Sequence, residues 1–145
     1  MTLSSWLPWA LLSALFAALT AIFAKVGIEG IDSDFATLFR TVVVALTLGA
    51  LVYATGKWQS PFEIQPKSAI FLVLSSLATG ASWVCYFRAL KMGAASNVAT
   101  VDKLSVVLVA VFAVMFLGER VGVREWLGIA LVGGGVLLLS LRSGQ

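Results

Sequence analysis

Histidine is absent from this 145-residue chain, cysteine occurs once, as Cys85, and only 12% of the residues are charged. Without histidine and with one thiol, the usual ligands of structural zinc and of redox sites are missing, and no disulfide can form within the chain. So few charges cannot cover the surface of a water-soluble domain. We therefore expect no metal, no cofactor and no soluble fold.

The chain is rich in apolar residues. They make up 60% of the chain, and the mean hydropathy is +1.01. A span needs about 20 apolar residues, so the length allows about five of them, with no separate soluble domain. We predict one membrane domain over residues 1–145, an all-α bundle of five transmembrane helices in the lipid bilayer. The predicted helices cover about 6–24, 35–55, 67–90, 95–117 and 124–141.

The fourth predicted helix carries an acid and a base inside its apolar run. Asp102 lies about seven residues in, roughly 10 Å deep in a hydrocarbon core about 30 Å thick. Charged residues at such depth usually face a bundle interior or a water-filled cavity. Since neighbours in sequence point about 100° apart on a helix, Lys103 is expected to be a poor partner, and Asp102 is expected to pair with Lys25, Arg40 or Arg88.

This charged set, Asp102, Lys103, Lys25, Arg40 and Arg88, has two interpretations. It is either an ion-pair network that fastens helices together or part of a substrate path. Four cations around one acid leave positive charge for an anionic group of a substrate.

Two further sets of residues stand out in the helices. The third helix is polar in its middle, where Thr79, Trp83 and Tyr86 share a face; Trp83 is read either as packing or as a pocket wall of the substrate path. The fifth helix contains a run of glycines that permits close backbone approach, either to a second copy or to the fourth helix. These glycines are Gly128, Gly133, Gly134 and Gly135.

Positive charges do not favour one orientation in the membrane. The loops on the amino-terminal side carry Lys57, Lys67, Arg120 and Arg124. The opposite side carries Lys25, Arg40, Arg88, Lys91 and Arg142. The terminal amine cancels the difference of one, so the positive-inside rule gives no clear answer. We predict insertion in both orientations and an antiparallel homodimer, which recreates the inverted repeat of many transporters.

Several segments together resemble a known family. They are KVGIEGIDSDFATLFRT (25–41), the turn from Arg88 to Gly93, the Leu-Gly-Glu sequence ending at Glu119, and the glycine-rich last helix. The chain resembles a single-repeat, half-size EamA-type member of the drug/metabolite transporter superfamily. Full members have two repeats and ten helices and move small metabolites, so the resemblance implies that this chain pairs. Glu119, at a helix end, is read as structural.

We therefore predict a secondary transporter or exchanger of a small polar metabolite, amino-acid-like or anionic, in the cell inner membrane. Its path would lie between two oppositely oriented protomers, with no nucleic acid bound. One alternative is a small multidrug exporter, although residues 6–24 lack the acid that such proteins use. A second is a non-transport assembly or lipid-handling subunit. An enzyme is not expected, because the sequence contains no recognisable pair of a nucleophile and a base, and no catalytic residue is assigned.

Overall fold

The computed structural model describes residues 6–142, and side chains as far as Ser140, so the Arg142 side chain lies outside the described part. Five stretches are long and apolar enough to cross a membrane. They are Leu7–Gly27, Ser33–Ala54, Pro66–Met92, Ala95–Leu117 and Val123–Ser140. The rest of residues 6–142 contains turns and one short 3₁₀ helix, with no strand. The prediction of an all-helical chain with five such helices is confirmed.

The chain divides into two compact units. One comprises Phe23–Lys91, and the other comprises the segments that end at Ile22 and begin at Met92. Each is described by itself below. The expectation of one domain over the whole chain stays a prediction.

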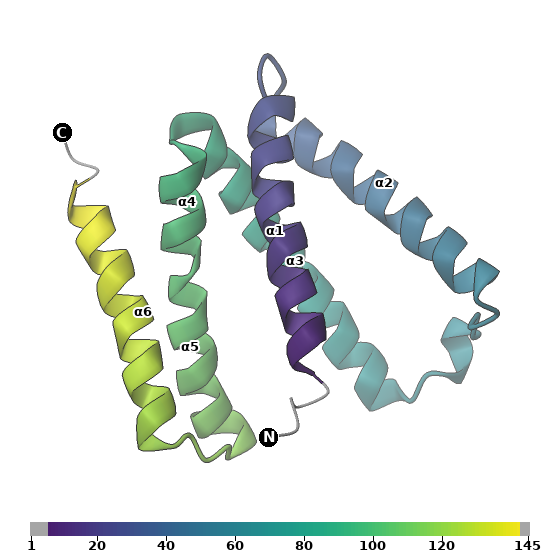
Figure 1. Cartoon of the computed structure of the whole chain (residues 1–145). Coiled ribbons are helices and arrows are strands. Elements are labelled where there is room, and N and C mark those ends of the chain that lie inside the picture. Colours follow the sequence, from purple (N-terminus) through teal and green to yellow (C-terminus); the bar gives the residue numbers. More distant parts are fainter. Residues whose placement is uncertain (1–5, 143–145) are drawn as a thin grey trace. The chain divides into compact units, whose positions relative to one another are not determined.

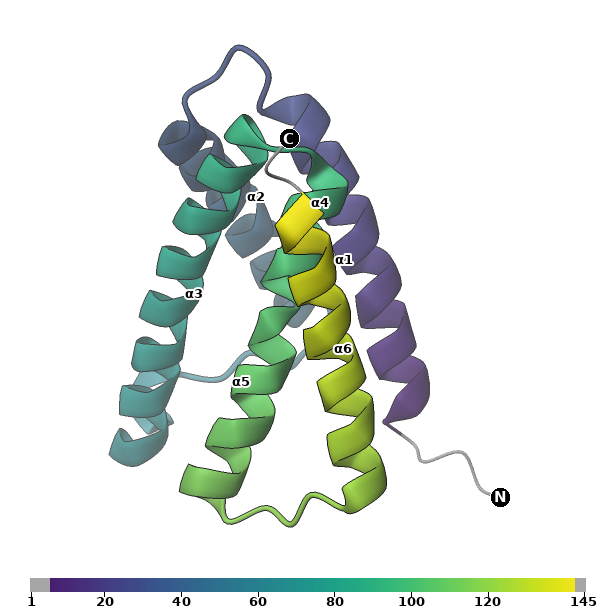
Figure 2. The ribbon, with the colours of Figure 1, turned by 90° about the vertical axis from the view of Figure 1, so that its left-hand side faces the viewer.

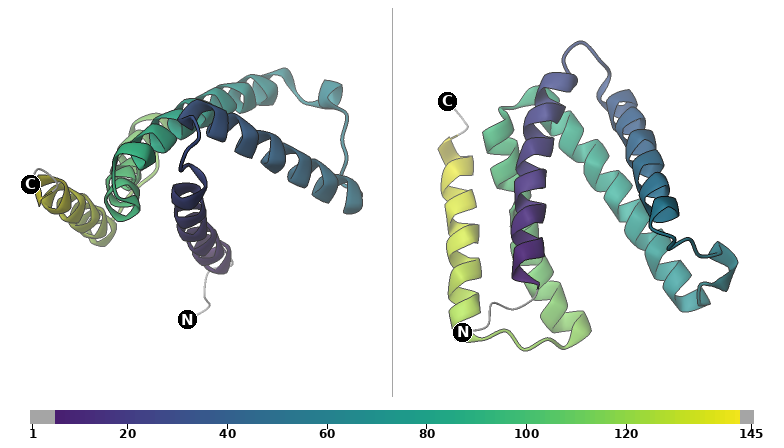
Figure 3. Two further views of the ribbon diagram at one scale, coloured as in Figure 1. Left: turned by 90° about the horizontal axis from the view of Figure 1, so that it is seen from above. Right: turned by 45° about the vertical axis from the view of Figure 1, so that its right-hand side comes forward.

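The Phe23–Lys91 unit contains the end of α1 (Leu7–Gly27), α2 (Ser33–Ala54), the 3₁₀ helix η1 (Pro61–Glu63) and α3 (Pro66–Met92) (Figure 1). The segment that includes η1 joins the far ends of α2 and α3 (Figure 3). Helix α2 begins two residues earlier than predicted because Asp32 caps it, accepting hydrogen bonds from the N–H groups of Asp34 and Phe35. Gly30, with φ of 74°, supplies the left-handed residue in the preceding turn.

The second unit contains α4 (Ala95–Asp102), α5 (Leu104–Phe112), the π-helix η2 (Ala113–Leu117) and α6 (Val123–Arg142). Helices α5 and α6 lie side by side and run in opposite directions (Figure 2). The turn that joins them begins at Gly118, which ends the π-helix in the left-handed conformation with φ of 67°. The backbone N–H of Glu119 then donates to the carbonyl of Ala113, with an N···O distance of 3.2 Å.

The fourth span is not the single regular helix predicted over 95–117. Its α-helical bonding is interrupted at Lys103, whose N–H bonds the Thr100 carbonyl at 3.0 Å, while the Lys103 carbonyl accepts from Val106 at 3.0 Å. These three-residue spacings are those of a tight 3₁₀ turn. The Thr100 hydroxyl donates to the Ser96 carbonyl at 2.7 Å, a contact that often bends helices. The span therefore breaks at its charged residues without any proline.

Candidate functional site

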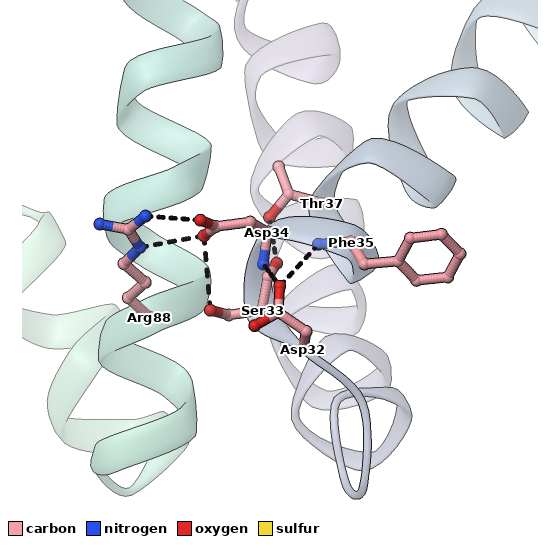
Figure 4. Close-up of polar contacts among 6 residues, drawn as sticks. All are labelled: Asp32, Ser33, Asp34, Phe35, Thr37 and Arg88. Atoms are coloured by element: carbon pink, nitrogen blue, oxygen red, sulfur yellow. Dashed lines mark hydrogen bonds and ion pairs between the residues drawn. The ribbon is translucent and has the colours of Figure 1, made fainter.

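A cluster of polar side chains joins the start of α2 to the end of α3. Arg88 donates from Nε to Asp34 Oδ1 at 2.9 Å and from Nη2 to Asp34 Oδ2 at 2.5 Å (Figure 4). This two-point geometry is the strongest form of an arginine–carboxylate contact. Asp32 makes it possible, because its capping bonds hold Asp34 in the first turn of α2. Within the Phe23–Lys91 unit the partner of Arg88 is thus Asp34, and the pairing of Asp102 with Lys25, Arg40 or Arg88 stays a prediction.

Two lysines link the same elements through backbone oxygens. Lys25 Nζ donates to the carbonyl of Leu90 at 2.6 Å, and Lys91 Nζ donates to the carbonyl of Ile31 at 2.8 Å. Leu90 is completely buried. A lysine that reaches a carbonyl near a helix carboxyl end satisfies an acceptor that the helix cannot. These two cations therefore have roles in holding α3 to the segment before α2.

Arg40 is held differently, by aromatic rings. Its guanidinium carbon lies 4.2 Å from the ring centroid of Trp83 and 5.6 Å from that of Phe87. Arg40 continues a stripe on α2 with Ser33 and Thr37, both buried, while Arg40 itself is half-buried. Because α2 begins at Ser33, Arg40 lies about two turns inside the helix, deeper than the one turn predicted.

The aromatic face of α3 combines predicted and unpredicted residues. Trp83 faces Arg40, and Tyr86 lies with its ring centroid 6.5 Å from that of Phe87. Thr79 donates its hydroxyl to the Ser75 carbonyl at 2.9 Å, within its own helix. Phe87 was not among the predicted residues, although its position four residues after Trp83 predicts the same face. Asp34 was also missed as an ion-pair partner, since no spacing rule connects it to Arg88.

Asp102 and Lys103 lie together at the break in the fourth span. Lys103 Nζ is 3.5 Å from Asp102 Oδ2, and both side chains are exposed. The expectation that Lys103 is a poor partner is therefore wrong. The reason is the lysine side chain, which is long and flexible enough to bring Nζ back to the neighbouring carboxylate although the two side chains leave the helix in different directions.

The glycines of α6 have different surroundings. A Cβ added at Gly133 would lie 3.2 Å from Val107 Cγ2, so Gly133 allows α6 to approach α5. Nothing lies within 4 Å of a Cβ added at Gly128, Gly134 or Gly135. Gly128 and Gly135 are seven residues apart and share a face, roughly opposite to Gly133. Of the four candidates, one packs within the chain and three have space beside them.

Within residues 6–142, no three His, Cys, Asp or Glu side chains come together as a metal site would require. The charged side chains that do come together can hold helices to one another or bind a charged ligand. Asp34 forms an ion pair with Arg88, and Asp102 lies beside Lys103. Within the Phe23–Lys91 unit, Arg40 contacts aromatic rings and forms no ion pair, whereas Lys25 and Lys91 donate to backbone carbonyls.

Comparison with known proteins agrees with this membrane architecture. The model of the EamA-like transporter family matches residues 4–141. A Sinorhizobium sp protein named "Uncharacterized transporter in cobO 3'region" is 60% identical over 137 residues, which is 94% of this chain and 97% of that protein. No solved structure matches the chain. The family match extends over all five spans, and the protein therefore belongs to the EamA-like transporter family, as a multi-pass membrane transporter and not an enzyme.

Proposed function

We propose that the protein is a secondary transporter or exchanger of a small polar metabolite that carries an anionic group, and that it works in the cell inner membrane. The observation that carries this proposal is the difference among the cations of the Phe23–Lys91 unit. Arg88 forms an ion pair with Asp34, and Lys25 and Lys91 donate to backbone carbonyls, whereas Arg40 forms neither kind of bond within this unit. An ionisable residue inside a membrane span is costly to keep, and such residues commonly mark a substrate path.

The path is proposed to lie between two oppositely oriented copies of the chain. Support comes from the balanced positive charge on the two groups of loops, which gives no preferred orientation. Family members with two repeats contain both orientations in one chain, and a single repeat obtains the second by pairing. Exchange between two equivalent asymmetric states of such a pair would alternately open the path to each side.

The dimer contact is proposed to involve the face of α6 that carries Gly128 and Gly135. Small residues let two backbones approach closely in lipid, where apolar side chains gain little by leaving the bilayer. Support comes from the space beside these two glycines, where an added Cβ meets no atom within 4 Å. Gly133 is already used against Val107 within the chain.

The protein is proposed to act as an exchanger or facilitator, driven by the gradients of its substrates. In the fourth span, Lys103 Nζ lies 3.5 Å from Asp102 Oδ2 at the break in the helix. The interruption at Lys103 is proposed as a place where the fourth span can bend during the cycle.

The test is flux by the purified protein in liposomes. Liposomes are loaded with a mixture of isotope-labelled amino acids and small carboxylic acids, and release is followed by mass spectrometry with the unlabelled mixture outside. We expect protein-dependent exchange of one or a few acids, absent from protein-free liposomes. No flux, together with copurification of a larger partner in unequal amounts, would support the assembly-subunit alternative. Protection of cells against quaternary ammonium compounds that depends on Asp102 would support the drug exporter.

A further inference from the structure

Four cations near the start of α2 and the end of α3 differ in whether their donors are already used. Lys25 and Lys91 donate to backbone carbonyls, and Arg88 donates two hydrogen bonds to Asp34. Arg40 contacts two aromatic rings and makes no hydrogen bond to oxygen within the Phe23–Lys91 unit. Arg40 is therefore the one of these four whose guanidinium N–H groups are not committed to an oxygen acceptor.

Arginine commonly stacks on an aromatic ring with the flat side of its guanidinium, and this arrangement leaves the edge of the guanidinium available. The Arg40 Cζ lies 4.2 Å above the Trp83 ring, a distance at which the cation is attracted by the π-electrons. The five N–H groups of arginine lie in the guanidinium plane, and they match the two oxygens of a carboxylate in a two-point contact. A stacked arginine is thus held in place while it still offers donors to a ligand.

The two threonine hydroxyls nearest to Arg40 in the sequence of α2 are already bonded to the backbone of their own helix. Thr37, one turn before Arg40 on α2, donates a hydrogen bond from its hydroxyl to the Ser33 carbonyl at 2.8 Å. Thr41 donates in the same way to the Thr37 carbonyl at 2.7 Å. Phe87 is almost completely buried, so the aromatic support on α3 is fixed in place. Because Arg40 is only half-buried, its edge remains accessible.

We propose that Arg40 binds the carboxylate of the transported metabolite through the edge of its guanidinium, and that Trp83 and Phe87 are positioning residues that hold the guanidinium flat. The inference rests on the proposed transport function and narrows its substrate class to small carboxylic acids, including amino acids. The phosphate of an anionic lipid headgroup presents similar oxygens, so the test separates the two sources.

The test detects ligand binding through the fluorescence of Trp83. In a variant in which the other four tryptophans are replaced by phenylalanine, Trp83 fluorescence is titrated in nanodiscs of phosphatidylcholine only, at constant ionic strength. The four are Trp6, Trp9, Trp58 and Trp126. The probes are acetate and benzoate, each compared with its neutral amide. We expect a saturable change with the carboxylates and none with acetamide or benzamide.

Substitutions at Arg40 separate binding from folding. Arg40→Lys keeps the charge but loses the planar fork, and we expect it to weaken carboxylate binding by at least about tenfold. Arg40→Ala should abolish binding. Arg120→Lys, in the turn before α6, is the matched control and should bind as the parent does. Trp83→Phe, followed by competition against a labelled carboxylate, should bind more weakly while it unfolds at a similar temperature.

Other results would overturn the inference. They are an equal response to the amides, unchanged affinity in Arg40→Lys, or a response that appears only in nanodiscs containing phosphatidylglycerol, which would assign Arg40 to lipid binding. The two proposals can also fail separately. Carboxylate exchange in liposomes that is unaffected by Arg40→Ala refutes the role of Arg40 and leaves transport intact. Arg40-dependent binding without any flux refutes transport and leaves the binding site.

Discussion

Replacing Gly133 of α6 by leucine should destabilise the protein, whereas leucine at Gly135 should not. A Cβ at residue 133 would lie 3.2 Å from Val107 Cγ2, already tighter than ordinary contact, and the rest of a leucine side chain has to enter the same space between α5 and α6. At residue 135 nothing lies within 4 Å of the added Cβ. Both changes gain the same helix propensity over glycine, so their difference isolates the packing contact.

Overpacking of a close contact typically costs about 1–3 kcal/mol, and we expect Gly133→Leu to be less stable than Gly135→Leu by that amount. The assay is unfolding of each purified variant in detergent, followed by helical circular dichroism. The same samples report the dimer through light scattering. Gly135→Leu should fold normally but show a smaller dimer fraction, because the added side chain occupies the proposed contact. Equal stabilities of the two variants would contradict the assignment of Gly133 to the contact with α5. An unchanged dimer fraction in Gly135→Leu would contradict the assignment of Gly135 to the dimer contact.

Three further variants test other parts of the structure. Asp34→Arg and Arg88→Asp should each lower the unfolding temperature, and the double swap should recover part of the loss; additive losses would contradict a direct pair. Gly118→Ala should cost about 1–2 kcal/mol because φ is 67° there, while Gly122→Ala, which has no such backbone strain, should cost less in the same measurement. Asp102→Asn should retain exchange in liposomes, and that exchange should not respond to an imposed pH gradient. If a pH gradient drives substrate accumulation by the parent protein but not by Asp102→Asn, transport is coupled to protons.

Features that depend on local sequence were predictable. Long, mainly apolar runs predict the five spans, because in lipid a helix satisfies the hydrogen bonds of its own backbone. The glycine at residue 118 of the Leu-Gly-Glu sequence has the left-handed backbone typical of a helix end. The start of α2 was misjudged by two residues because apolar content indicated Phe35, whereas the capping oxygen of Asp32 determines the actual first turn.

Features that depend on contacts between helices were not predictable. Helical spacing places Asp102 and Lys103 on different faces, but the flexible lysine side chain brings its Nζ within 3.5 Å of Asp102 Oδ2. Asp34 lies just before the predicted second helix, yet in the structure it is in the first turn of α2 and pairs with Arg88. The sequence also could not tell which α6 glycine is used within the chain, since that depends on the face that α6 turns toward α5.

The antiparallel pair is tested most directly by the orientation of the chain in cells. The carboxyl terminus is fused separately to green fluorescent protein, which is fluorescent only in the cytoplasm, and to alkaline phosphatase, which is active only outside it. The account predicts comparable normalised signals from both fusions, because the loop charges are balanced. Signal from only one fusion would contradict insertion in both orientations and exclude an antiparallel homodimer in those cells.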